Sequence, residues 1–95
     1  MQGTIIRSDG SEHTISSLKH VRDVSLVLHA PFESLEYEQV SDEDGSAMTV
    51  VYNERAQIVN HAATQALPEL AEVAGGSIRG DILVMASTDF QRLDT

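Results

Sequence analysis

The chain has 95 residues, of which 41% are hydrophobic, 4% are aromatic and none is cysteine. This length suits one domain, expected to span residues 1–95, and the lack of cysteine excludes disulfides and thiolate metal sites. Fifteen acidic residues against six Lys and Arg give a formal net charge of −9, which argues against direct binding to nucleic acid or an anionic membrane. No apolar run reaches the roughly 18 residues of a membrane span, and the N-terminus is too short and polar for a signal peptide. We therefore expect a cytoplasmic protein.

The first elements in chain order are predicted to be a hairpin and a helix. Residues 2–7 are predicted to form the first strand, the Asp-Gly pair at 9–10 favours a tight turn, and residues 13–15 supply the returning strand. Ser16 or the serine after it is a good helix cap, so a short helix is expected over residues 16–22.

Period-two alternation or continuous apolar character predicts the remaining strands. These strands are expected over residues 24–29, 35–40, 47–52 and 82–86. A second helical region is predicted over residues 60–74, with Asn60 as its cap and Pro68 at the first position of its second part. The glycine pair at 75–76 is expected to end it.

These elements predict a single small α+β domain with a mainly antiparallel sheet of about five strands. Two short helices, near 16–22 and 60–74, are expected to pack on one face. Because two helices leave the other face uncovered, we also expect a homodimer or higher oligomer.

No motif in the chain predicts a metal, a cofactor or a catalytic centre. The four histidines are far apart in the sequence. The acidic run from Asp42 resembles the start of a calcium loop, but Asn53 stands where that loop needs a bidentate glutamate. The glycine-rich stretch 75–80 precedes a strand, whereas a phosphate-cradling loop follows one. The sequence leaves enzyme activity open and favours binding.

Six of the acidic residues fall within residues 33–44. One interpretation is a solvated surface and a hairpin tip, where charge is common. The other is an anionic face for a basic partner, acting as a nucleic-acid mimic. Both interpretations stay open on the sequence alone.

The central segment carries a pattern of short motifs. It runs Val-Val-Tyr-Asn-Glu at 50–54, Asn60 and then Ala-Thr at 63–64, and Gly-Asp-Ile-Leu-Val at 80–84. Over about residues 47–86 it resembles an uncharacterised domain-of-unknown-function family of small proteins common in phages, mobile elements, actinobacteria and archaea. The resemblance implies a phage or mobile-element setting and no particular reaction. The acidic hairpin region and the extra helical turn at 68–74 depart from the family pattern.

Four polar residues of this segment form the candidate ligand-binding site: Asn53, Arg55, Asn60 and Arg79. Read structurally, Asn53 closes an Asx turn and Asn60 caps a helix, while Gly80 supplies a positive φ and Asp81 a turn hydrogen bond. Read functionally, the four candidate residues converge with Thr64 and Asp81 at one end of the sheet and form a polar pocket. The two arginines would then bind a phosphate or carboxylate.

Three classes of function follow from this sequence. The favoured class is a small, plausibly phage-encoded binding protein. It would sequester a small anionic ligand, such as a nucleotide immune signal, or a host protein. The alternative is an acidic interaction protein that blocks a basic nucleic-acid-binding host factor. A small nucleotide hydrolase is the least favoured class, because no constellation of catalytic residues is recognisable.

Overall fold

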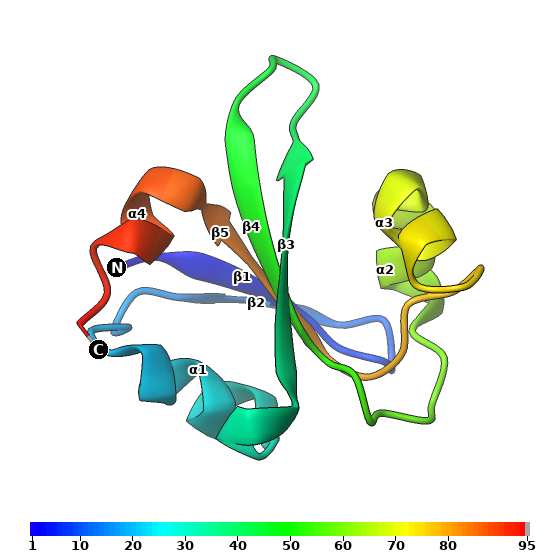
Figure 1. Ribbon diagram of the computed structural model, residues 1–95, viewed down its shortest axis with the longest axis horizontal. Helices are drawn as coiled ribbons and strands as arrows, with labels where there is room; N and C mark the ends of the chain where they lie inside the picture. The colour runs from blue at the N-terminus through cyan, green and yellow to red at the C-terminus, as the bar shows by residue number, and fades with distance from the viewer. Residues whose placement is uncertain (95) are drawn as a thin grey trace.

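Five strands form one antiparallel sheet in the computed structural model, which describes residues 1–94 (Figure 1). The strand order is β2-β1-β5-β4-β3, with every neighbouring pair antiparallel. The predicted α+β class is thereby confirmed. The elements are β1 (Gly3–Ile6), β2 (Glu12–Ile15), α1 (Val21–Leu28), the 3-10 helix η1 (Phe32–Ser34), β3 (Leu35–Ser41), β4 (Ala47–Asn53), α2 (His61–Ala66), α3 (Pro68–Val73), β5 (Ile82–Ala86) and α4 (Ser87–Gln91).

Two hairpins and one inserted strand build the sheet. The Asp-Gly turn predicted between β1 and β2 is confirmed, with Gly10 at φ 92°. The acidic run 42–45 forms the tip between β3 and β4, where Gly45 adopts φ 87°. Glycine is favoured at both positions because a Cβ disfavours positive φ. β5 then enters between β1 and β4 and joins the two hairpins.

Helices cover both faces of the sheet, so the prediction that they pack on one face is wrong. Figure 1 shows α1 and α4 on one side and α2 and α3 on the other. Each side has its own core: Leu18, Val24 and Leu28 pack with Leu83 on the first, and Leu70 packs with other buried residues on the second. Two helices were predicted and α4 was not, so one face of the sheet was expected to be bare. Self-association is therefore not needed to cover a bare face.

Residues 24–29 form most of α1 and not a strand, so this prediction is also wrong. Val24 and Leu28, four residues apart, are buried, whereas Leu26 between them is 68% exposed. In a strand all three would share one face, but in a helix the middle one points away. His29 ends the helix in the left-handed conformation with φ 52°.

The helix predicted over residues 16–22 begins only at Val21. Leu18 is buried in the core but lies in a segment without regular secondary structure. The cap comes from Asp23 rather than from a serine: its carboxylate accepts hydrogen bonds from the backbone N–H groups of Lys19 and His20, at 3.0 and 2.9 Å. An acidic residue in the first helical turn also complements the helix dipole.

α4 follows β5, in a part of the chain where no helix was predicted. Its first residue, Ser87, shares a 2.9 Å hydrogen bond with Thr49 of β4, and both side chains are buried. Leu93 then packs into the core cluster that contains Val24 and Leu28 of α1. No helix within residues 1–94 is long and apolar enough to cross a membrane.

Candidate functional site

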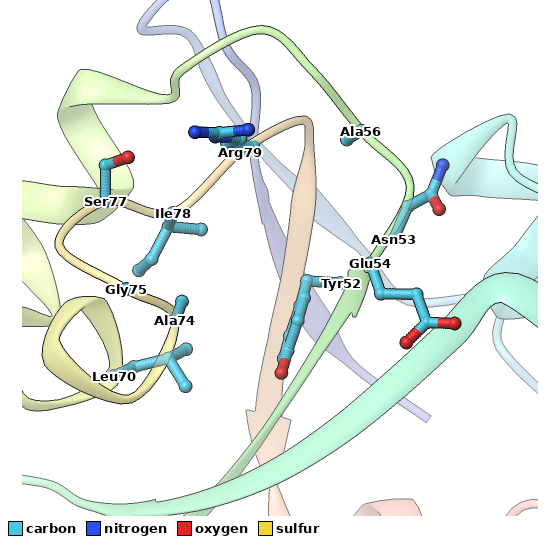
Figure 2. A pocket seen from close by; sticks show the side chains of 10 residues that line it. All are labelled: Tyr52, Asn53, Glu54, Ala56, Leu70, Ala74, Gly75, Ser77, Ile78 and Arg79. Carbon is cyan, nitrogen blue, oxygen red and sulfur yellow. The ribbon is translucent and has the colours of Figure 1, made fainter.

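A pocket of about 410 Å³ lies between the end of β4 and the end of α3, and we call it the β4–α3 pocket. Two smaller pockets, of about 230 and 130 Å³, lie elsewhere on the described chain. Figure 2 shows the Tyr52 ring on one wall, with Leu70 and Ile78 across from it. The lining residues are Tyr52, Asn53, Glu54, Ala56, Leu70, Ala74, Gly75, Ser77, Ile78 and Arg79.

The wall opposite Tyr52 is made where the chain leaves α3 and returns to the sheet. Pro68 starts α3 at its first position, as predicted. Gly75 and Gly76 end it with φ 91° and 114°, and the Gly76 N–H donates to the Ala71 carbonyl at 2.7 Å. This tight reversal brings the following residues back toward β4. The glycine pair that looked like a helix stop therefore also shapes the pocket.

Asn60 fixes that wall to the sheet. Its side-chain oxygen accepts from the Ala63 N–H at 3.0 Å, so the predicted N-cap is confirmed. Its amide nitrogen donates to the carbonyls of Ile6 and Gly80, at 2.9 and 2.8 Å. Asn60 is 0% exposed. Because its buried amide has no access to water, these protein hydrogen bonds satisfy its polar atoms.

Two neighbours complete this connection. The Thr64 hydroxyl donates to the Asn60 carbonyl at 2.8 Å and accepts from the Ile78 N–H at 3.0 Å. Gly80 has φ 76°, as predicted, and a Cβ placed there would lie 2.6 Å from Ala56. Only glycine fits both the backbone angle and this contact without a shift of the neighbouring chain.

The structure brings two of the four candidate residues to the pocket. Asn53 and Arg79 are among the lining residues, whereas Arg55 is not and Asn60 is buried beside the pocket. The Asn53 side chain points away from the pocket interior in Figure 2, and its oxygen accepts from the Arg55 N–H at 3.0 Å, which confirms the Asx turn.

Asp81 does not join the pocket. Its two carboxylate oxygens accept from the Arg7 guanidinium at 2.8 Å and from the Ser8 N–H at 2.9 Å. These bonds hold the turn between β1 and β2 against the start of β5. Asp81 therefore forms a hydrogen bond at a turn as expected, but the turn belongs to a distant part of the chain.

Three carboxylates lie around Tyr52. In the register of β3 and β4, Glu36 pairs with Tyr52 and Glu38 pairs with Val50. Directly opposed residues of antiparallel strands point to the same face, and Val50 and Tyr52 face α2 and α3. Glu54 lines the pocket itself. These three carboxylates, Glu36, Glu38 and Glu54, form an acidic wall beside Tyr52. Of the three, Glu54 is a lining residue of the pocket, and in Figure 2 its carboxylate points away from the pocket interior.

The pKa of Glu36, which belongs to the acidic wall, and the pKa of its neighbour Tyr52 are both raised. A side-chain hydrogen bond with Glu54, and then the Glu54 charge, raise the pKa of Glu36 above its ordinary value of 4.5. Partial burial and then the charges of Glu38, Glu36 and Glu54 raise the pKa of the Tyr52 hydroxyl above 10.0. Tyr52 is therefore a neutral hydrogen-bond donor at physiological pH, and the potential around it is negative.

Arg79 is the basic group of the pocket. Figure 2 places it at the end opposite the Tyr52 hydroxyl. Among residues 1–94, the ion pairs join Arg7 to Asp81 and His20 to Asp94, so Arg79 takes part in neither. The same part of the chain holds no group of three or more His, Asp or Glu side chains arranged for a metal ion.

The sequence reasoning missed Tyr52 and the acidic wall. Tyr52 was predicted only as part of the strand over residues 47–52, and Glu36 and Glu38 only as part of the strand over residues 35–40. The pairing of Glu36 with Tyr52 depends on the hairpin register, which a turn of uncertain length does not reveal. The signal that was available is the alternation of Glu36 and Glu38, which puts both on one face.

No protein family, curated protein or solved structure matches the chain. The resemblance of residues 47–86 to an uncharacterised phage-associated family therefore stays a prediction. The site has to be interpreted from its own geometry.

Proposed function

We propose that the protein is a non-catalytic binding protein that captures a small ligand in the β4–α3 pocket, with an anionic group of the ligand on Arg79. The observation that carries this proposal is the pocket itself: about 410 Å³, with an aromatic ring on one wall and a guanidinium at one end. This volume falls in the range of small-molecule sites, which combine apolar walls with a few polar groups.

The lining supplies both affinity and orientation. Leu70 and Ile78 offer apolar surface opposite the Tyr52 ring, and a flat ligand between them would remove that surface from water. Arg79 adds a charge-assisted hydrogen bond to a carboxylate or phosphate, worth roughly 1.5–3 kcal/mol once shielded from water. Stoichiometric capture needs no more than these contacts.

The ligand class and setting extend this proposal. The resemblance to phage-associated proteins makes a nucleotide immune signal one ligand to test, and the cytoplasm of a host cell the place of capture. A ring and an anionic group are the features that the pocket offers to recognise. A nucleotide has both.

The test compares two exposed arginines, of which one lines the pocket. Purified protein is titrated with a nucleotide panel by calorimetry, and bound ligand is recovered after denaturation and checked for intact mass. Arg79→Ala should weaken binding at least about tenfold, which corresponds to about 1.4 kcal/mol. Arg55→Ala is the matched control, because Arg55 is also exposed but does not line the pocket.

Equal loss of binding in both variants would mean that net charge, and not the pocket, governs affinity. Recovery of a hydrolysed ligand would replace capture with catalysis. If no anionic ligand binds and Arg79→Ala changes nothing measurable, the proposal fails.

The acidic hairpin supports a second candidate function, the blocking of a basic host factor. In Figure 1 the β3–β4 hairpin extends past the helices on both sides of the sheet, and Asp42, Glu43 and Asp44 at its tip are exposed. Replacing these three with Asn, Gln and Asn removes three charges in one place. Loss of binding to a basic nucleic-acid-binding protein, with small-ligand binding unchanged, would support this function over the first.

Homo-oligomerisation remains part of the proposal on a narrower basis. Both faces carry helices, but several large apolar side chains on separate parts of the chain are exposed, including Leu26, Ile58 and Val73 at 68%, 70% and 70%. Self-association is one way to bury such groups. Light scattering that gives the 10.3 kDa chain mass at high micromolar concentration would exclude it.

A further inference from the structure

We propose that the outer edge of β3 binds an extended, basic segment of a partner protein, which adds to the sheet as a further strand. This edge lies outside the β4–α3 pocket, so the inference goes beyond ligand capture. Within residues 1–94, β3 is the last strand in the sheet order, and β4 is its one strand neighbour. In Figure 1 it runs between the helices on the two sides of the sheet, with α1 and α4 on one side and α2 and α3 on the other.

The hydrogen bonds at the two ends of β3 show which of its backbone groups face outward. At one end the Glu54 N–H donates to the Ser34 carbonyl at 3.0 Å, and at the other the Asp42 N–H donates to the Ser46 carbonyl at 2.8 Å. The register between these pairs is continuous, and in an antiparallel ladder alternate residues bond the neighbouring strand. The even-numbered residues of β3 therefore bond β4. The odd-numbered residues Tyr37, Gln39 and Ser41 direct their N–H and C=O groups to the outer edge.

This edge offers both elements of strand addition. A row of backbone groups at a sheet edge accepts an extended peptide through main-chain hydrogen bonds, and pockets beside the edge select its alternate side chains. Such a pocket, of about 230 Å³, lies beside β3 and α4, and its lining includes Tyr37, Gln39 and Phe90. The Tyr37 and Phe90 rings have centroids 5.3 Å apart, and Tyr37 is 39% exposed. An apolar side chain of the added strand would cover these rings.

The side chains on the other face of the edge indicate that the partner is basic. Glu36 and Glu38 alternate with Tyr37 and Gln39 along β3, so they point to the opposite face of the sheet. Residues of an added strand directly opposite them would have Cβ atoms about 4.5–5.5 Å away. Lys or Arg at these positions would pair with the two carboxylates, whereas Asp or Glu would be repelled. The preferred segment therefore alternates basic and apolar residues.

The same carboxylates disfavour a second copy of this chain on the edge. A two-fold axis that overlaps the seven residues of β3 completely would set the Glu38 side chains of the two copies directly opposite each other. Like charges in that position destabilise a strand pair, and each copy carries a formal net charge of −9. Charges on an edge strand protect against self-pairing of this kind, but they attract a strand of opposite charge.

The test uses the peptide Ser-Lys-Val-Lys-Phe-Lys-Thr-Lys-Ser, acetylated and amidated at its ends. It is titrated by calorimetry into the full-length protein at about 150 mM salt, which screens long-range attraction. A version with Glu in place of every Lys should bind at least about tenfold more weakly. In the complex, hydrogen exchange at the Tyr37, Gln39 and Ser41 amides should slow at least about tenfold, because these groups gain main-chain partners.

Two N-methylated versions of the Lys peptide separate strand pairing from charge, because both keep every lysine. When the peptide lies antiparallel to β3 with its apolar side chains beside Tyr37, the N–H groups of Val and Phe point to β3, and those of the lysines point to solvent. Backbone methylation at Val and Phe should weaken binding at least about tenfold. Methylation at the two central lysines should change it by less than about threefold.

A proline on β3 tests the same edge from the side of the protein. Gln39→Pro removes an outward N–H and leaves the residues that bond β4 unchanged, a position at which an edge strand tolerates proline. It should abolish binding of the Lys peptide, and the matched variant Gln39→Thr should retain it. If Gln39→Pro does not fold, the two N-methylated peptides decide the inference.

A charge variant tests the choice of partner. Glu36→Gln with Glu38→Gln should weaken binding of the Lys peptide about tenfold. Asp42→Asn with Glu43→Gln is the control, because it removes two charges at the hairpin tip, beyond the end of β3. It should change the affinity by less than about threefold.

The contrary outcomes each overturn the inference. If both N-methylated peptides bind as tightly as the Lys peptide, charge alone holds the peptide. If the hairpin-tip variant loses as much affinity as the Glu36 and Glu38 variant, the net charge of the chain governs binding. If the unmodified protein is a dimer that Gln39→Pro converts to a monomer, a second copy occupies the edge. Absence of binding at millimolar peptide also shows that the inference is wrong.

Discussion

The two faces of the sheet are built differently, although each carries two short helices. On the face under α1 and α4, the buried side chains are large and continuous, and Leu83 and Val51 are fully buried between the layers. On the face under α2 and α3, the helices are tied to the sheet by the buried polar group Asn60, and a pocket remains beside Tyr52. The first face is held mainly by apolar packing, and the second leaves a pocket open beside Tyr52.

The difference follows from where the helices sit along the chain. α4 follows β5 without a break, so it is held close to the sheet, and Leu93 then closes the layer. α2 and α3 are joined through the bend at Leu67, whose φ and ψ of −130° and 66° are not helical. Because α2 and α3 have six residues each and meet at a bend, they do not cover this whole face of the sheet. The end of β4 therefore stays open.

The largest expected effect comes from emptying the closed face. Leu83→Ala should lower the free energy of unfolding by about 3–4 kcal/mol, because the side chain is fully buried and the deletion leaves an enclosed cavity. For a domain of this size, that corresponds to a fall in Tm of roughly 12–30 °C. Urea denaturation and calorimetry both measure it.

Leu70→Ala makes the matched change on the pocket face. Leu70 is 2% exposed but lines the pocket, so its removal enlarges a space that is already open to solvent. The expected cost is about 2 kcal/mol, at the low end for such a deletion. Equal losses for the two variants would erase the contrast between the faces.

A second prediction removes the polar connection that holds α2 and α3. Asn60→Ala should cost about 2–3 kcal/mol, because the Ile6 and Gly80 carbonyls and the Ala63 N–H lose their partner in a buried site. It should also weaken ligand binding, since the bonds position the wall that carries Ile78 and Arg79. Hydrogen exchange should accelerate in α2 and α3 more than in α1.

Thr49→Val is the control for that variant on the closed face. It removes the hydrogen bond to Ser87 but adds an apolar group of similar shape, so a loss of about 1 kcal/mol is expected. If Asn60→Ala costs no more than Thr49→Val and leaves α2 and α3 fully protected, the polar connection is not what holds the pocket face together.

Local signals in the sequence predicted the elements that local chemistry determines. The Asp-Gly turn, the Asn60 cap, Pro68 at the start of α3 and the positive φ of Gly80 all follow from backbone preferences of single residues. The strand predicted at 24–29 failed because Val24, Leu26 and Leu28 match period two, although Val24 and Leu28 also match a helix. Tertiary packing buries Val24 and Leu28 together, and this favours the helix over the strand.

The candidate site was only half predictable for a related reason. Arg79 and Asn53 flank recognisable turns, so their place at strand ends could be inferred. The contribution of Glu36 depends on its pairing with Tyr52, a contact between strands that the sequence does not state. The number of helices was also missed, since α4 has only five residues and depends on packing against β4 and β5 for its stability.

The smallest expected effects compare one acid from each face, and they have opposite signs. Hydrogen bonds from the backbone of His20 and Lys19 lower the pKa of Asp23 below 3.8, so its stabilisation is present above that pH and lost as the pH falls through the folded pKa. Glu54 raises the pKa of Glu36 above 4.5, so the corresponding stabilisation is present below that pH and lost as the pH rises through the folded pKa. At pH 7, Asp23→Asn should therefore lower Tm and Glu36→Gln should raise it slightly. Both differences should shrink as the pH falls toward 3. A Glu36→Gln variant that is less stable than the parent at pH 7 would show that the carboxyl pair supports the hairpin and that repulsion between Glu36 and Glu54 does not destabilise the fold.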